Sequence, residues 1–299
     1  MKVAVTGASG LIGSALVRQL RARGDQVLTV VRRSARHAGE VAWDPVAGDV
    51  DLGALAGVDA LVHLAGAPVG AHRWTPSYKS VILRSRVEGT RTIARALASL
   101  RPAPRVLVSG SAMGYYGDRG DELLDESAAP GVGFFPDVVM AWEGAADPAR
   151  EAGIRVVHPR TTLVMAPQGG AFGRLLPLVR LGLGGPLGSG RQWWSWITLT
   201  DEVRALVFAI DQPLHGPVNL GSPQPLRQRE LIAALARAAH RPALLPAPAF
   251  ALRIALGQFA DDIMASDRLV PTALTEAGFS FEHPDIDTAA AWVLQPNPH

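Results

Sequence analysis

The sequence contains no cysteine, and this excludes several kinds of chemistry at once. Without thiols the protein can have neither disulfide bonds nor thiolate catalysis, nor metal or iron–sulfur sites held by cysteine. Proton-transferring phenols and amines are also scarce, because only three tyrosines and two lysines are present. The eight histidines show no paired spacing of the H-x-x-x-H kind, so we expect no metal site.

The sequence also has no large excess of positive or negative charge and few long apolar runs. The net charge is only +2, and no basic run is longer than Arg32-Arg33, so we expect no nucleic-acid partner. The longest apolar stretch, Ala243 to Leu256, is interrupted by prolines and an arginine and cannot span a bilayer. The first strand pattern begins at Lys2, which leaves no room for a signal peptide. We therefore expect a cytoplasmic protein without a membrane partner.

What the chain does contain is a glycine-rich turn close to its start. An apolar strand pattern at 3–5 leads into this turn, and residues 14–20 behind it repeat their apolar positions at helical spacing. A strand, a tight glycine turn and a helix form a phosphate site, because glycines let the backbone approach the ligand and free N–H groups bind the anion. The residues expected to hold a dinucleotide here are Gly7, Ser9, Gly10, Leu11, Ile12 and Gly13.

The second strand, at 26–31, indicates which dinucleotide is bound. Enzymes that prefer NAD usually place an acidic residue at the end of this strand, where it holds the ribose 2′-hydroxyl. Here the strand ends in Arg32 and Arg33, and guanidinium groups suit a 2′-phosphate. A solvated basic turn is the alternative interpretation. The sequence favours NADP as the cofactor, with Arg32 and Arg33 among its ligands.

Apolar patterns alternate between strand and helix spacing through the first half of the chain. Strands are expected at 59–64, 105–109 and 154–158, and helices at about 77–100 and 136–151. This alternation predicts an α/β fold with a Rossmann-type doubly wound parallel sheet. Ligands of such sheets lie beyond the C-terminal ends of the strands. Further cofactor contacts are therefore expected from Leu64, Ala65, Gly66 and Ser109.

The character of the sequence changes after Arg160. Residues 165–191 are rich in glycine, a helix and a strand pattern return at about 201–210 and 218–220, and the pattern from Leu226 onward is mainly helical. We expect residues 1–165 to form the NADP-binding Rossmann domain, with 198–221 returning to it. Residues 166–197 and 222–299 are expected to form a smaller, mainly helical C-terminal lobe that closes over the sheet.

Four motifs together carry a resemblance to a known family. They are Thr6 to Gly13, Gly114-Tyr115-Tyr116-Gly117, Gly188 to Gln192 followed by Ser195-Trp196-Ile197, and Glu276 to Phe281. The whole chain resembles the extended short-chain dehydrogenase/reductases, and within them an epimerase-family subgroup. The resemblance implies an NADP-dependent oxidoreductase or isomerase that acts as a monomer or homodimer. Its substrate is an unidentified small molecule, for which a nucleotide sugar is one candidate.

The chain departs from this superfamily at the catalytic dyad. Most members carry Tyr-x-x-x-Lys on the helix after the fifth strand, where the lysine lowers the pKa of the tyrosine for proton exchange with the substrate oxygen. The corresponding positions here are Phe135 and Val139, and neither side chain can transfer a proton. Ser111 matches the catalytic serine of the superfamily, and Tyr115 and Tyr116 follow it in the same loop. These three residues are the catalytic candidates.

Several of these assignments have a second interpretation. The two tyrosines could form a packed turn that stacks on the cofactor, and Asp137 and Glu143 are expected on a solvated helix face. An arginine beside aromatic rings suits an anionic, partly apolar substrate, although the tryptophans could instead cover the core. The substrate-binding candidates are Lys79, Arg86, Arg160, Arg191 and Trp193. Because the dyad is absent, a catalytically silent NADPH sensor is the alternative function.

Overall fold

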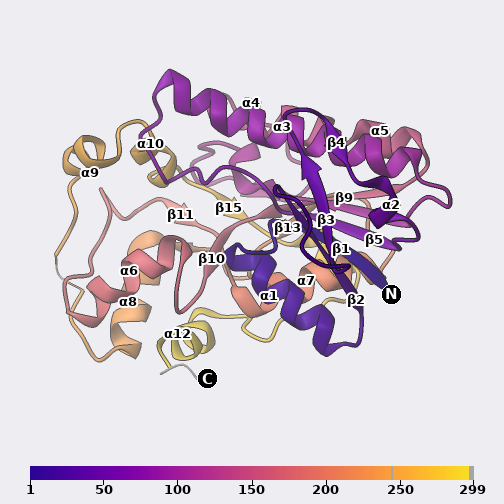
Figure 1. Ribbon diagram of the computed structural model, residues 1–299. Helices are drawn as coiled ribbons and strands as arrows, with labels where there is room; N and C mark the ends of the chain where they lie inside the picture. Colours follow the sequence, from indigo (N-terminus) through magenta and orange to yellow (C-terminus); the bar gives the residue numbers. More distant parts are fainter. Residues whose placement is uncertain (244, 296–299) are drawn as a thin grey trace.

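The computed structural model describes residues 1–243 and 245–295, which are built around one central sheet (Figure 1). Its strands are β1 (Lys2–Thr6), β2 (Gln26–Val31), β3 (Glu40–Asp44), β4 (Asp49–Val50), β5 (Ala60–His63), β6 (Val106–Ser109), β7 (Ser111–Ala112), β9 (Arg155–Thr161) and β13 (Gly216–Leu220). The strand order is β13-β9-β6-β5-β1-β2-β3-β4, and β7 also pairs with β9. All of these pairs are parallel except β3 with β4. The predicted Rossmann-type sheet is confirmed.

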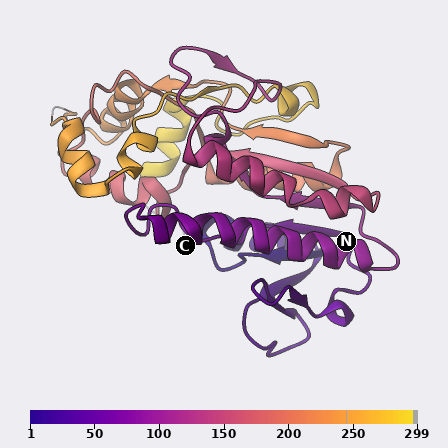
Figure 2. The same ribbon diagram turned by 90° about the horizontal axis from the view of Figure 1, so that it is seen from above.

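Helices cover both faces of the sheet (Figures 1 and 2). One face carries α3 (Pro76–Ser99), α4 (Phe134–Gly144) and α5 (Asp147–Glu151), and the other carries α1 (Leu11–Ala22) and α7 (Leu199–Asp211). Alternate residues of a strand point to opposite faces. In β1, Val3 and Val5 therefore pack in the cluster that includes α1 and α7, whereas Ala4 packs in the cluster that includes α3. Burial on both faces explains why the strands are almost continuously apolar.

The rest of the chain forms a second, smaller part, at the left of Figure 1. The helices and strands not named so far, most of which belong to this part, are α2 (Leu52–Leu55), η1 (Met113–Tyr115), β8 (Leu123–Leu124), β10 (Leu163–Met165), α6 (Gly170–Arg180), β11 (Trp193–Trp194), β12 (Trp196–Thr198), β14 (Leu226–Arg227), α8 (Gln228–Ala238), α9 (Ala249–Leu256), α10 (Phe259–Ile263), β15 (Arg268–Leu269), α11 (Thr272–Glu276) and α12 (Ile286–Leu294). A separate apolar cluster runs from Phe172 and Trp196 to Leu235 and Val293. The predicted helical C-terminal region is thus present. The predicted division into residues 1–165 with 198–221 and residues 166–197 with 222–299 stays a proposal.

Besides several short elements, one strand and one helix differ from the expectation. The strand β3 was not predicted, because the charged residues at its two ends leave only three apolar positions between them. The helix expected over 136–151 consists of α4 and α5. Proline lacks the N–H that a helix interior needs and is favoured in a first turn, so the chain starts a new helix at Asp147 with Pro148 in its first turn. Within the described residues, no helix has the length and apolar character needed to cross a bilayer.

Candidate functional site

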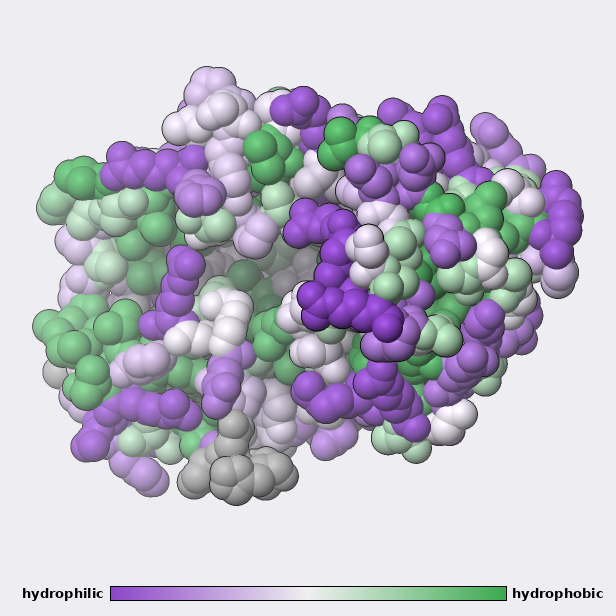
Figure 3. Space-filling model, viewed as in Figure 1, coloured by the Kyte–Doolittle hydropathy of each residue, from purple (hydrophilic) through white to green (hydrophobic). Residues whose placement is uncertain are grey.

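The glycine turn joins β1 closely to the start of α1. Gly7 has a φ of +66°, and a Cβ at this position would lie 2.8 Å from the carbonyl carbon of Leu64. A Cβ on Gly13 would lie 2.2 Å from the carbonyl oxygen of Gly7. Gly10 begins α1 without a side-chain cap, so the first N–H groups of the helix remain available to an anion. The turn therefore fits a dinucleotide pyrophosphate, and it borders the face that is hollowed near its centre in Figure 3.

Thr6 connects the ends of two neighbouring strands. Its hydroxyl accepts the N–H groups of Leu64 at 3.0 Å and Ala65 at 3.1 Å, and it lies 2.8 Å from Nδ1 of His63. Burial lowers the pKa of His63 to about 4, so this imidazole is neutral. Because the Thr6 oxygen already accepts two N–H groups, the hydroxyl donates its own proton to Nδ1 of His63. The loop that begins at Leu64 is thereby held beside the glycine turn. Its predicted cofactor contacts stay a prediction.

The two arginines after β2 have different surroundings. Arg33 donates from Nη1 and Nη2 to the two oxygens of Glu40, at 2.7 and 2.5 Å. The hydrogen bond from Arg33 and another from the Arg36 backbone lower the pKa of Glu40 to about 2, so its carboxylate is ionised. Arg32 is exposed and makes no hydrogen bond or ion pair with another residue in the described ranges. Its guanidinium is therefore available to a ligand at the end of β2.

A chain of polar side chains lies at the C-terminal ends of β6, β9 and β13. Ser111 Oγ donates to Oε1 of Glu143 at 2.6 Å. Arg160 binds the same carboxylate twice, from Nε to Oε1 at 2.9 Å and from Nη2 to Oε2 at 3.0 Å. Its Nη1 donates to the hydroxyl of Tyr116 at 2.9 Å, and this hydroxyl donates to Oδ1 of Asn219 at 2.7 Å. Five residues from separate elements are thus connected in one network, which we call the Ser111–Asn219 network.

Burial and the charge of Arg160 together set the protonation states within this network. The side chains of Arg160 and Glu143 are only 3% and 14% exposed. Burial alone would raise the pKa of Glu143, but hydrogen bonds and charge from Arg160 lower it below its ordinary value. Glu143 is therefore ionised at neutral pH. Burial raises the pKa of Tyr116 to about 12, so this fully buried phenol stays neutral.

Tyr115 has surroundings unlike those of Tyr116. Its side chain is partly exposed, and the guanidinium carbon of Arg160 lies 3.5 Å from its ring centroid. The rings of the two tyrosines meet edge to face, with centroids 5.2 Å apart. The hydroxyl of Tyr115 has no hydrogen-bond partner within residues 1–243 and 245–295. Of the two phenols, Tyr115 is therefore the one that can reach a ligand.

The helix α4 carries the positions of the missing dyad. Phe135 and Val139 are both buried there, and a Cβ on Gly114 would lie 2.0 Å from the Phe135 ring. Glu143 follows one helical turn beyond Val139, so these three residues share one stripe of the helix. The expectation that Glu143 lies on a solvated face was wrong, because its carboxylate turns inward to Arg160. Asp137, by contrast, is exposed.

Two of the predicted substrate-binding cations lie on α3. Lys79 is partly exposed, and its Nζ lies 4.6 Å from the ring centroid of Phe134. Arg86 is buried, donates to the carbonyl oxygen of Ala67 at 3.0 Å and stacks on Trp142 at 4.9 Å. Burial lowers the pKa of Arg86 to about 10. Arg86 therefore stabilises the loop after β5 through its hydrogen bond to Ala67. The substrate-binding roles of Lys79 and Arg86 stay predictions.

The other predicted substrate contacts come from the smaller part of the molecule. Arg191 is exposed, and the guanidinium carbons of Arg227 and Arg268 lie over the ring of Trp193, 4.2 and 4.3 Å from its centroid. Trp193 also donates from Nε1 to Asp121 at 2.8 Å. The substrate role of Arg160 stays a prediction too, although the Ser111–Asn219 network engages its guanidinium in a role that the sequence did not indicate.

The parallel sheet, the glycine turn and the uncapped start of α1 define a dinucleotide-binding protein of the Rossmann type. Residues 3–221 match the NAD dependent epimerase/dehydratase family, and residues 247–293 match a domain of unknown function (DUF1731). The chain belongs to the NAD dependent epimerase/dehydratase family. The resemblance to the epimerase subgroup of the extended short-chain dehydrogenase/reductases is thereby confirmed.

Relatives support this assignment along the whole chain. An epimerase family protein of Mycobacterium bovis is 44% identical over 292 residues, which cover 97% of this chain and 96% of the relative. The crystal structure of human epimerase family protein SDR39U1 with NADPH has 30% identity and a TM-score of 0.90, and covers 98% of this chain and 99% of that one. A nucleoside-diphosphate sugar epimerase structure from Corynebacterium glutamicum has 34% identity and a TM-score of 0.78, over 97% of this chain and 57% of that one.

Proposed function

We propose that this protein is an NADP-dependent oxidoreductase or epimerase that acts on a small molecule through Ser111 and Tyr115. One observation carries the proposal. Ser111 follows the C-terminal end of β6, and an available phenol, Tyr115, comes four residues later at the sheet edge that also holds the glycine turn. A nicotinamide bound along this edge supplies hydride transfer, and the two hydroxyl groups bind the reacting oxygen of the substrate.

Three features support NADP rather than NAD as the cofactor. Arg32 is available at the end of β2, where a 2′-phosphate would lie. Arg33 stands beside it and offers further N–H donors, although the ionised Glu40 balances its charge. The human relative was crystallised with NADPH. Nucleotide sugars are the first substrate class to test, because one relative is described as a nucleoside-diphosphate sugar epimerase.

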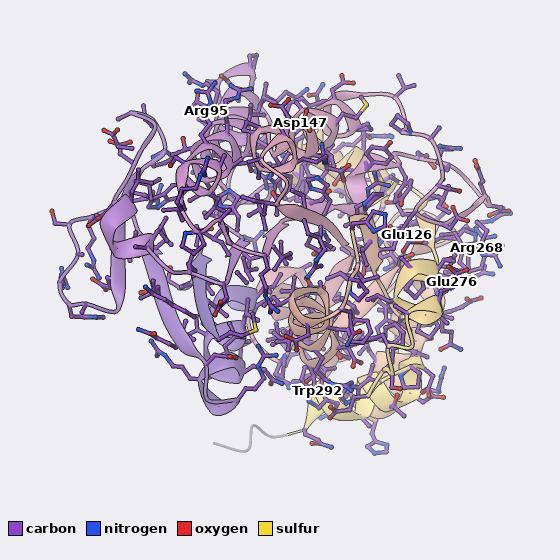
Figure 4. The ribbon with its side chains drawn as sticks, turned by 90° about the vertical axis from the view of Figure 1, so that its right-hand side faces the viewer. Arg95, Glu126, Asp147, Arg268, Glu276 and Trp292 are labelled. Carbon is purple, nitrogen blue, oxygen red and sulfur yellow. The ribbon has the colours of Figure 1, made fainter. Side chains whose placement is uncertain are left out.

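We expect NADPH to bind at least tenfold more tightly than NADH, a difference of about 1.4 kcal/mol in binding free energy. Arg32→Ala should remove most of this preference, because it deletes the cation expected to bind the 2′-phosphate. Calorimetry with both cofactors measures the effect. Arg95→Ala is the matched control, because Arg95 is exposed on α3 (Figure 4). Equal affinities in the native protein, or an undiminished preference in Arg32→Ala, would contradict the assignment.

A substrate screen tests the reaction itself. Nucleotide sugars and secondary alcohols are offered with NADP⁺, and carbonyl compounds with NADPH, while nicotinamide absorbance and sugar products are followed. Turnover that disappears in Ser111→Ala supports an enzyme that uses this site. Turnover that is unchanged in Ser111→Ala places the chemistry elsewhere and rejects the proposed site.

One observation favours a second candidate function. Phe135 and Val139 leave the usual dyad positions apolar and buried. In this alternative the protein is a catalytically silent sensor that binds NADPH and reports its level through a change of conformation. Tight NADPH binding without turnover on the whole panel would support the sensor and reject the enzyme.

A further inference from the structure

The hydrogen bond between Ser111 and Glu143 fixes the direction of the serine proton. A serine hydroxyl has one proton and two lone pairs, whereas an ionised carboxylate can only accept. The Ser111 proton therefore points to Oε1 of Glu143, 2.6 Å from Oγ. The lone pairs of Oγ remain for a ligand. Ser111 thus offers an acceptor, suited to the hydroxyl group of an alcohol, rather than a donor.

Glu143 also stands on the stripe of α4 where the superfamily carries its proton-transferring pair. Residues four apart on a helix lie on the same face. Phe135, Val139 and Glu143 follow one another at this spacing, and Glu143 is the one member that can carry a proton. The apolar residues occupy the usual positions, and a carboxylate stands one turn further along the same helix.

We propose that Glu143 accepts the substrate proton through Ser111, in place of the absent Tyr–Lys pair. This inference rests on the proposed function. Glu143 acts through Ser111 and does not itself touch the substrate. In the same arrangement, Tyr115 donates a hydrogen bond to the reacting oxygen, while Ser111 accepts the hydrogen bond of the substrate hydroxyl.

The proton and the hydride balance in this scheme. When an alcohol is oxidised, the hydride of its C–H bond passes to an oxidised nicotinamide. The alcohol O–H bond breaks, its proton moves to Oγ of Ser111, and the original serine proton moves to Oε1 of Glu143. The products are a carbonyl compound, a reduced nicotinamide, an unchanged serine and a neutral Glu143. The reduction of a carbonyl compound follows the same steps in reverse.

The groups around Glu143 determine how this transfer depends on pH. Arg160 binds both carboxylate oxygens from β9, and His158 of the same strand is buried and neutral, because burial lowers its pKa to about 4. From α3, Arg86 stacks on the neighbouring Trp142. Arg160 keeps Glu143 ionised down to acidic pH. We therefore expect the rate of alcohol oxidation to fall as the pH falls through the lowered pKa of Glu143.

The main test compares Glu143→Gln with the native protein. The amide retains the size of the side chain but cannot take up the proton, so turnover should fall ~100-fold or more, as is typical when an acid–base group is lost. The acidic limb of the pH–rate profile should disappear, and NADPH affinity should change little. Glu143→Asp retains a carboxylate and should recover part of the rate and the acidic limb. Asp137→Asn, an exposed change on the same helix, is the matched control and should have no effect.

A second readout does not depend on the rate. Infrared difference spectra are recorded after protein loaded with NADP⁺ is mixed with UDP-glucose, UDP-N-acetylglucosamine or 1-phenylethanol, whichever the native protein oxidises. A carboxylic-acid band should appear in the native protein and in Asp137→Asn, and it should be absent from Glu143→Gln. If Glu143→Gln does not fold, the same band in Glu143→Asp should shift, because the carboxyl group is displaced.

The outcomes separate the two proposals. No turnover of any compound by the native protein rejects the proposed function and this inference with it. Native turnover that Glu143→Gln retains in full, with its acidic limb, rejects the inference alone and leaves the function in place. Loss of rate without loss of the acidic limb or of the infrared band would also reject it, because Glu143 would then have only a structural role.

Discussion

Tyr115→Phe is expected to lower turnover ~100-fold or more while NADPH affinity stays nearly unchanged. Removal of one hydrogen-bond donor to a reacting oxygen typically lowers kcat by 10²–10³. Tyr115 fits this role because its side chain is partly exposed and its ring is held against the guanidinium of Arg160. Steady-state kinetics on the compound found by screening, with NADPH titrations alongside, measure the effect.

The neighbouring tyrosine provides the comparison. The hydroxyl of Tyr116 is fully buried and is shared between Arg160 and Asn219. Tyr116→Phe should therefore act mainly on stability, by about 1–3 kcal/mol, the usual effect of leaving buried polar groups without a partner. Tyr115→Phe should lower the rate equally at every pH, whereas Glu143→Gln removes the acidic limb. If both phenylalanine variants keep full activity, the donor must be Lys79, a carboxylate or water.

Arg160→Ala is expected to lower the free energy of unfolding by about 3–5 kcal/mol, because it leaves the buried carboxylate of Glu143 without its cation. Urea denaturation measures the loss. Arg253→Ala is the matched control, because the ion pair of Arg253 with Asp261 is more than half exposed and should contribute only about 0–1 kcal/mol. Equal losses in the two variants would contradict the assigned role of Arg160.

The same variant should change how stability depends on pH. In the native protein the pKa of Glu143 is lowered, so its stabilisation is present at neutral pH and is lost as the pH falls through that value. Without Arg160, burial is the largest remaining influence and raises the pKa of Glu143. The folded variant then binds the proton more tightly than the unfolded chain does. Its deficit in stability should therefore shrink as the pH falls, and denaturation at acidic and neutral pH tests this.

Local patterns were sufficient to predict the sheet and the cofactor turn. The glycines, the strand before them and the helix behind them all lie between residues 2 and 22, so their geometry depends on neighbours in the sequence. The positions of Arg32 and Arg33 likewise depend only on the short strand β2 that precedes them. In contrast, β3 is held by its pairing with β2 and by the ion pair from Arg33 to Glu40, and neither appears in a local pattern.

The polar contacts of the site could not be predicted in the same way. Glu143 and Arg160 are 17 positions apart in the sequence, and only the packing of α4 on β7, which pairs with β9, brings them together. A helical pattern with charges at its end is usually solvated, which led to the wrong placement of Glu143. The available signal was its spacing of four residues from Val139, on a stripe that is otherwise apolar.

Asn219 completes the Ser111–Asn219 network from β13, the last strand of the sheet in sequence order. During synthesis on the ribosome, β9 therefore emerges long before the partner that covers its outer edge. Until Leu220 has been made, β9 is an open sheet edge, and such edges readily pair with other chains. The intervening segment, 166–215, must also fold back over the sheet without blocking that edge. Completion of the site is thus a late event in the production of the protein, and a fragment that ends near residue 165 would carry an unfinished sheet.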